Sequence, residues 1–138
     1  SHLILGHLAM VEVLREEFPS LAPSVRLGVT LNSPSFAPAT HSPDDAAAAR
    51  RASDFTLGWF LRPVLQGSYP RVMVERLGPR LPRFTLEEEK RLTRSIDFLG
   101  LNTYASRLVS DASDRDTIAS YFNNDMAVAT SSDPSWER

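Results

Sequence analysis

The stretch DFLGLNTY, residues 97–104, decides the fold class of this chain. Its apolar residues do not alternate strictly with polar ones, a pattern that is typical of a parallel strand covered on both faces. The apolar run ends where the polar side chains of Asn102 and Tyr104 begin. In a (β/α)8 barrel, polar residues at the carboxyl end of a strand point into the mouth of the active site. The stretch therefore predicts a fully buried parallel strand that ends in candidate site residues.

The rest of the chain alternates helices, strands and loops. Apolar residues three to four apart predict a helix over residues 2–18, and alternation predicts a strand over residues 25–32. The sequences SPDD (42–45) and TLEE (85–88) have the residues of helix N-caps and capping boxes. The remaining expected segments are a loop over 33–42, a helix over 42–61 that Pro63 ends, an irregular stretch over 67–82 with a short helical turn at 72–77, a helix over 85–93, and a loop beyond 110. This order is typical of βα units that share a parallel sheet.

Several further motifs accompany the strand in a fixed order. They are SHLILGHL (1–8), RLGVTLN (26–32), GSYP (67–70), RLPRFT (80–85) and EEE (87–89). Together with DFLGLNTY they resemble glycoside hydrolase family 1, the β-glucosidase family, over roughly residues 1–110. The resemblance implies an α/β fold: a fragment of a (β/α)8 TIM barrel, from about the fourth helix to just past the sixth strand. Residues 1–138 would then be a partial barrel domain, with 111–138 as the loop after the sixth strand.

The size of the chain agrees with a fragment. A (β/α)8 barrel needs about 250 residues, whereas this chain has 138. The family motifs "NEP" and "TENG", which carry the acid/base and nucleophile glutamates, occur nowhere in the sequence. We therefore expect no catalytic residue in this segment, and no turnover by the chain alone.

The resemblance implies a reaction and roles for a few residues. The reaction is retaining hydrolysis of β-glucosides or related β-glycosides, in carbohydrate metabolism, without a cofactor. Tyr104 matches the family tyrosine that donates to the nucleophile carboxylate, and Asn102 matches an asparagine beside the same carboxylates. Asn32 ends the earlier strand, where it can line the site, and Thr103 is expected to face away from the barrel interior. Without the resemblance, Tyr104 would be read as packing at a strand end and Asn102 as starting a turn.

Two alternatives to this function stay open. The chain can be a non-catalytic truncated product, or a piece used for binding or assembly. Within the enzyme class, a 6-phospho-β-glycosidase is the weaker alternative. The partners that the leading hypothesis implies are a β-glycoside substrate and the remaining barrel segments of the parent enzyme.

Other charged residues have structural explanations. Asp44-Asp45 and Glu87–Glu89 lie in the first turns of predicted helices, where acidic side chains favour the helix dipole. Arg50-Arg51 are expected on a solvated helix face. His2 and His7, five residues apart, do not share the helix face that a metal pair would need, so no metal site is predicted.

Composition narrows the function further. The formal net charge of −2 gives no electrostatic footprint for nucleic acid. No apolar run of about 18 residues is present, so no membrane partner is expected. The chain has no cysteine, and its first residues do not resemble a signal peptide. These features leave the location open between cytoplasmic and secreted.

Overall fold

The computed structural model describes residues 2–113, 121–133 and 135. The helices and strands follow one another in this order: α1 (His2–Glu17), β1 (Gly28–Asn32), β2 (Ser35–Pro38), α2 (Pro43–Ser53), α3 (Trp59–Gln66), α4 (Arg71–Leu77), α5 (Leu86–Leu92), β3 (Phe98–Asn102), β4 (Ser106–Asp111), α6 (Tyr121–Met126) and β5 (Val128–Ser131). Short 3-10 turns lie at Ala22–Ser24 and Gly78–Arg80. A π-helical turn, Asp54–Gly58, joins α2 to α3.

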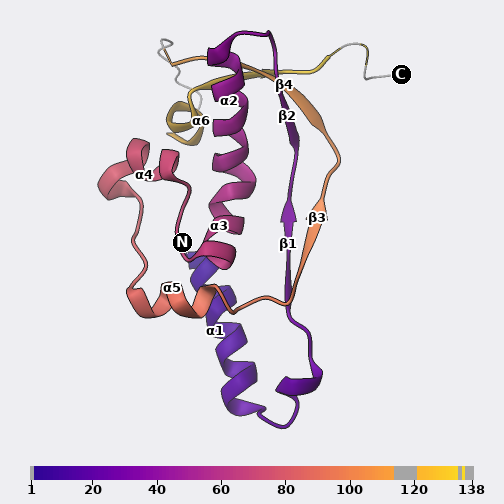
Figure 1. Cartoon of the computed structure of the whole chain (residues 1–138), viewed down its shortest axis with the longest axis vertical. Helices are drawn as coiled ribbons and strands as arrows, with labels where there is room; N and C mark the ends of the chain where they lie inside the picture. The colour runs from indigo at the N-terminus through magenta and orange to yellow at the C-terminus, as the bar shows by residue number, and fades with distance from the viewer. Residues whose placement is uncertain (1, 114–120, 134, 136–138) are drawn as a thin grey trace.

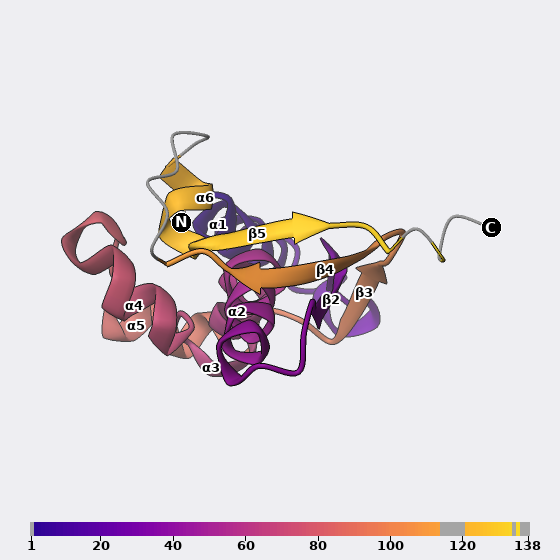
Figure 2. The same cartoon turned by 90° about the horizontal axis from the view of Figure 1, so that it is seen from above.

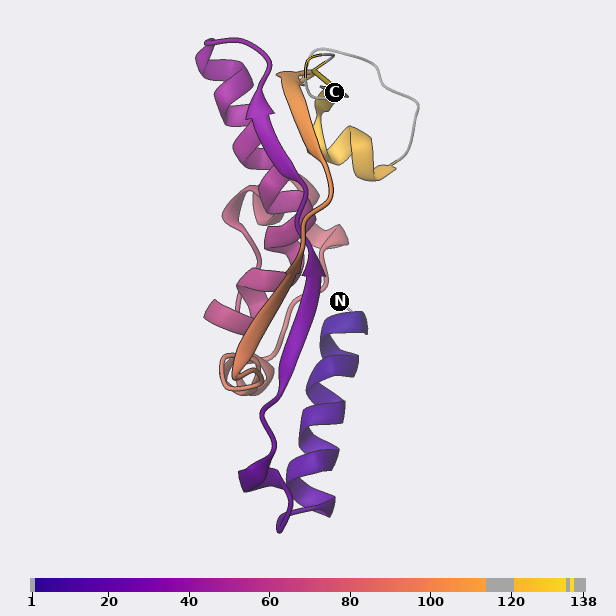
Figure 3. The same cartoon turned by 90° about the vertical axis from the view of Figure 1, so that its right-hand side faces the viewer.

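The strands form two small sheets that continue one another. β1 pairs with β3 in parallel, β2 pairs with β4 in parallel, and β5 is added antiparallel to β4. Figure 3 shows that β1 leads into β2 and that β3 leads into β4. The two segments run side by side along the length of the molecule. In Figure 1, α2 and α3 lie beside this ladder. Figure 2 shows β5 next to β4, with α6 at the same end of the molecule.

The core lies between the helices and the ladder. Ala48 and Ala52 of α2, Phe55 of the π-helical turn and Val109 of β4 are almost fully buried. Small alanine side chains let α2 approach the strands closely, and the larger Phe55 fills the space at the helix junction. Helix α1 adds buried residues at a helical spacing, namely Ile4, Leu8 and Val11. Amphipathic packing of this kind, rather than intrinsic helix propensity, stabilises short helices.

The predicted parallel strand pair is confirmed, with shorter bounds. The strand expected over 25–32 begins at Gly28, and the strand expected over 97–104 ends at Asn102. The fully buried strand that the pattern predicted is wrong for this chain, because Phe98 and Leu101 are 50% and 52% exposed. Their positions differ by three residues, so these two side chains point to opposite faces of β3. Within the described residues, neither face of β3 is completely covered.

The predicted helix starts are confirmed by their caps. The Ser42 hydroxyl accepts from the Asp45 amide at 3.1 Å. Thr85 and Glu88 form a reciprocal capping box, in which each side chain accepts from the other residue's backbone N–H. Such caps satisfy amides that have no partner within the helix.

The predicted helix end at Pro63 is wrong. Pro63 lies inside α3, which continues to Gln66 and ends at Gly67 in the left-handed region, with φ of 75°. A Cβ at Gly67 would also lie 3.0 Å from the Glu89 carbonyl oxygen, so glycine is required there for two reasons. A π-helical turn, Asp54–Gly58, lies directly before α3. Helices commonly kink at prolines and at π-helical turns and then continue.

Two predicted loops contain regular structure. β2 lies within the segment 33–42, and the segment 111–138 contains α6 and β5 in its described part. Each of these strands depends on a partner that is far away in the sequence. β2 pairs with β4, and β5 pairs with β4 from the other side. Each of these strands has only four residues, too few for a periodic signal, and their pairing is decided by tertiary contacts.

Candidate functional site

Asn32 and Asn102 lie side by side at the carboxyl ends of the parallel strands. Each is the last residue of its strand, and they are partners in the register of β1 and β3. The Ser33 amide donates to the Asn102 carbonyl at 2.8 Å, which holds the two strand ends together. Two polar amide side chains therefore reach the same edge of the sheet, where an amide can donate to and accept from a sugar hydroxyl or a carboxylate.

The same sheet face carries a polar residue one step below. Thr30 lies opposite Gly100, and a Cβ at Gly100 would be 2.8 Å from the Thr30 hydroxyl oxygen. Since residues two apart share a strand face, Thr30 lies on the face of Asn32. Glycine at position 100 leaves the space that the threonine side chain uses.

Tyr104 lies beyond the strand that was predicted to carry it. β3 ends at Asn102, and Tyr104 is in the segment between β3 and β4 with 87% of its surface exposed. The simple alternation that would place Asn102 and Tyr104 on one face therefore ends before Tyr104. The segment leaves the phenol accessible to groups outside the described residues.

The strand pair is fixed at its other end by Asp97. The Leu27 amide donates to an Asp97 carboxylate oxygen at 2.8 Å, and the Asp97 amide donates to the Leu27 carbonyl at 2.6 Å. These bonds set the register that brings Asn32 and Asn102 together. Sequence reasoning assigned Asp97 no role, although a lone acid directly before an apolar strand is a signal that could have identified it.

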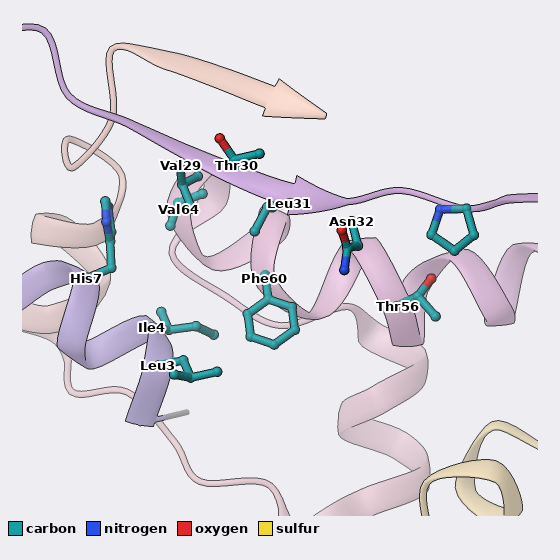
Figure 4. Close-up of a pocket in the computed structure, with 11 residues that line it drawn as sticks. Leu3, Ile4, His7, Val29, Thr30, Leu31, Asn32, Thr56, Phe60 and Val64 are labelled. Carbon is teal, nitrogen blue, oxygen red and sulfur yellow. The ribbon is translucent and has the colours of Figure 1, made fainter. Parts of the chain in front are cut away.

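An apolar cavity of about 420 Å³ adjoins Asn32. Figure 4 shows side chains of α1, β1 and the α2–α3 region around it, among them Ile4, Val29 and Phe60. The cavity runs along β1, whose one hydrogen-bonded neighbour in the described part of the chain is β3. Its polar lining includes Asn32, Thr56 and His7.

His7 and Ser95 form a hydrogen-bonded pair next to this cavity. The His7 Nε2 lies 3.1 Å from the Ser95 hydroxyl, and that hydroxyl donates to the Leu92 carbonyl at 2.7 Å. Burial lowers the pKa of His7 from its ordinary value, and hydrogen bonding at Ser95 offsets part of this effect. Because the serine proton is already committed to a carbonyl, the pair is a packing contact and not an activated nucleophile.

The arginine pair expected on a solvated face is divided. Arg50 is exposed, but the Arg51 side chain is 10% exposed. It lies against the described part of residues 111–138, called the tail below. Arg51 pairs with Asp111 and donates to the carbonyls of Met126 and Ala127 at 2.6 and 2.8 Å. The prediction for Arg51 is therefore wrong, because the tail that it holds was not recognised as structured.

Asp45 makes a second link to the same region. It is buried, and its carboxylate accepts from the Thr40 hydroxyl at 2.6 Å and from the Asp111 amide at 2.8 Å. These two hydrogen bonds, that of Thr40 first, lower the pKa of Asp45 from its ordinary value, and burial opposes them. The capping-box contact expected of Asp45 is absent, because the Ser42 amide donates to the Thr40 hydroxyl at 3.2 Å instead. The Asp45 carboxylate binds Thr40 and β4.

The motifs GSYP and EEE lie away from the strand ends. Tyr69 is buried and stacked on Phe84 at 4.7 Å, and burial, with a contribution from Glu88, raises its pKa to about 12. Glu87–Glu89 lie in the first turn of α5. Among the residues that the structure describes, no three His, Asp or Glu side chains are grouped as metal ligands, and no helix is long and apolar enough to cross a lipid bilayer.

Comparison with known proteins identifies similar chains. The sequence model of "Glycosyl hydrolase family 1" matches residues 1–138. A cyanidin 3-O-glucoside 5-O-glucosyltransferase (acyl-glucose) of Dianthus caryophyllus is 40% identical over 110 residues, which are 80% of this chain and 22% of that protein. Beta-glucosidase 17 of Arabidopsis thaliana is 38% identical over 131 residues, which are 95% of this chain and 24% of that protein.

A solved structure has the same fold over most of the chain. The rice Os3BGlu6 β-glucosidase superposes with a TM-score of 0.84 at 31% identity, over 94% of this chain and 27% of the rice chain. This chain therefore spans about a quarter of the length of the proteins it matches. The fold is a fragment of a (β/α)8 barrel, as predicted, and the strands of the described residues form two open sheets without a closed barrel.

Proposed function

Because the chain belongs to glycosyl hydrolase family 1, we propose that it is the central segment of a retaining β-glycosidase that acts on β-glucosides. The observation that supports this most is the pair Asn32 and Asn102 at the carboxyl ends of adjacent parallel strands. In (β/α)8 barrels the active site lies at this edge of the sheet. The segment runs from about the fourth barrel helix, α1, to just past the sixth barrel strand, β3.

The proposed chemistry needs two carboxyl groups that this segment does not supply. In a retaining glycosidase they stand about 5–5.5 Å apart, one as nucleophile and one as acid and then base. The described glutamates lie on helices, namely Glu12 and Glu16–Glu17 on α1, Glu75 on α4 and Glu87–Glu89 on α5. We infer that both catalytic glutamates come from other segments of the parent protein. The mechanism requires neither a metal nor an organic cofactor.

In this proposal the segment supplies polar groups around the nucleophile. Tyr104 donates its phenol proton to the nucleophile carboxylate, and Asn102 donates its amide beside the same group. Hydrogen bonds to the charged form favour that form, so they keep the nucleophile ionised next to a protonated acid. The exposure of Tyr104 in this chain supports the role, because a partner from another segment has access to it. Asn32 lines the same edge as a second amide.

The remaining barrel segments are the proposed protein partner of this chain. β1 has a cavity along its unpaired edge, lined by apolar residues such as Leu3, Val29 and Val64. A parallel strand buried between helices is mainly apolar and needs a hydrogen-bonded neighbour on each side. We propose that the preceding barrel strand of the parent protein lies in this cavity, beside β1.

Turnover by the full-length gene product that contains this segment tests the function. We expect it to hydrolyse an aryl β-glucoside and to release glucose of the β configuration first, because the mechanism retains configuration. Activity on the 6-phospho-glucoside alone would favour the 6-phospho-β-glycosidase instead. Absence of turnover on both would favour the truncated product or the binding piece. Since the Dianthus relative is named as a glucosyltransferase, release of glucose should be compared with and without an alcohol acceptor.

A further inference from the structure

The two strand segments of the parallel ladder, β1–β2 and β3–β4, differ in the number of residues between their paired positions. Asn32 pairs with Asn102, and Ser35 pairs with Ser106. Between these pairs, one chain contains residues 33–34 and the other contains residues 103–105. One extra residue is therefore inserted on the chain that carries Tyr104.

Backbone hydrogen bonds locate the insertion. The amides of Ser33 and Ser35 donate to the carbonyls of Asn102 and Ala105, at 2.8 and 3.0 Å. Donors two residues apart thus meet acceptors three residues apart. Pro34 consequently faces both Tyr104 and Ala105, which is the arrangement of a β-bulge. Bulges are rare between parallel strands, and they commonly occur next to active sites, where they redirect a side chain.

Hydrogen bonds on both sides of the bulge fix the strand register, so a register shift cannot remove the extra residue. Below the bulge, the bonds between Asp97 and Leu27 fix the register of β1 and β3. Above it, the Ala39 amide donates to the Val109 carbonyl at 2.7 Å and Asp45 accepts from the Asp111 amide. Pro34 also restricts its own φ to about −65°, away from the value of a regular parallel strand, so the chain opposite the bulge bends at the same place.

We propose that this bulge, formed by Tyr104 and Ala105 opposite Pro34, positions the Tyr104 phenol toward the nucleophile of the glycosidase. In a regular strand, Thr103 and then Tyr104 would continue the ladder after Asn102, and Tyr104 alone would lie opposite Pro34. The bulge releases it from the ladder, and the side chain is 87% exposed. This inference rests on the proposed function. It adds that a backbone irregularity, and not the strand alternation, sets the direction of the tyrosine.

Two variants of the full-length protein remove the bulge by opposite changes. One deletes Ala105, and the other inserts one alanine after Pro34, so both chains then have equal length between the pairs. We expect each variant to lower kcat/KM roughly ten- to a hundredfold, as loss of a hydrogen bond to a charged group would. The pKa that governs the acidic limb of the pH–rate profile should rise in both. In a Tyr104→Phe background neither change should lower kcat/KM further. Ser106→Ala, which keeps the chain length, is the control.

The outcomes separate this inference from the proposed function. A wild-type protein without glycosidase activity would overturn the proposed function, and the inference with it. An active wild type whose folded bulge variants keep their kcat/KM would overturn the inference alone. Losses that multiply with Tyr104→Phe would also overturn it, since the bulge would then act on another group. Failure of both variants to fold, seen by circular dichroism, would show that the bulge serves the fold instead of the tyrosine.

Discussion

Asn32 and Asn102 are partners across the parallel pair β1–β3, and each ends its strand. The amide of Ser33, the residue after Asn32, donates to the carbonyl of Asn102. This hydrogen bond fixes the backbone positions from which the Asn32 and Asn102 side chains extend. Asn32, which sequence reasoning gave a lesser role than Asn102, is therefore held at the same edge of the sheet. The relationship gives the segment two adjacent amides at the site edge of the proposed barrel.

Replacing Arg51 should release the tail from α2. Arg51→Met removes the ion pair with Asp111 and the bonds to the Met126 and Ala127 carbonyls. Hydrogen bonds to a charged group contribute about 1.5–3 kcal/mol, so the free energy of opening β5 should fall by about this amount. Amide hydrogen exchange over β5 measures it. The control is Arg50→Met, an exposed neighbour that should change the value by less than about 0.5 kcal/mol. Equal exchange in both variants would contradict the role of Arg51.

Asp45 should make stability depend on pH in the acidic range. Its pKa in the folded chain is lowered, chiefly by the hydrogen bond from the Thr40 hydroxyl. The stabilisation is therefore complete above the unfolded value, about 3.9, and is lost as the pH falls through the lower folded value. Asp45→Asn should unfold more easily than the wild type at neutral pH, and the difference should shrink toward pH 3. Urea unfolding midpoints across this range measure it, and equal midpoints of Asp45→Asn and the wild type at neutral pH would contradict the role of Asp45.

Local signals in the sequence predicted the elements that depend on local contacts. The caps at Ser42 and Thr85 and the helix of residues 2–18 needed only neighbouring residues, and the structure confirms them. The strand pair also followed from its pattern, because β1 and β3 keep their apolar runs. The family motifs supplied the barrel order that periodicity alone would not have given.

The elements that were missed depend on distant partners. β2, α6 and β5 are short, and they are held by β4 and by Arg51. The full burial expected for β3 was inferred from a pattern that reflects a complete barrel, whereas the described residues cover it only in part. The bulge at Tyr104 could not be predicted from the sequence, because it is defined by the register of two strand pairs and not by the residues of either strand.

The isolated chain should associate in solution. Helix α1 exposes Met10 by 75% and Val13 by 53%, and Phe18, the residue after the helix, is also 53% exposed. An exposed apolar face together with unpaired sheet edges favours self-association. Sedimentation should show oligomers that become more monomeric after combined Met10→Lys and Val13→Lys substitution. Val74→Lys, on the separate helix α4, should have less effect. A sharp, reversible thermal transition from a dilute wild-type monomer would count against this expectation.

The isolated chain should not hydrolyse an aryl β-glucoside above a buffer blank. Its described glutamates lie on the helices α1, α4 and α5 and not at the carboxyl ends of the strands, and Glu137 lies outside the described residues. Without two opposed carboxyl groups, the retaining mechanism has neither nucleophile nor acid. Release of the aryl leaving group, followed by absorbance, checks this. Robust turnover that is lost on replacing Glu75 or Glu88 by glutamine would overturn the assignment of both catalytic groups to other segments.

The pH dependence of kcat/KM for Tyr104→Phe in the full-length protein tests the central claim most directly. If the phenol donates to the nucleophile, its loss should slow glycosylation roughly ten- to a hundredfold and raise the pKa of the acidic limb, because the lost hydrogen bond favoured the ionised carboxylate. Thr103→Ser, one residue earlier, should leave both quantities as in the wild type. A Tyr104→Phe enzyme whose acidic limb coincides with that of the wild type would contradict the account and remove Tyr104 from the site.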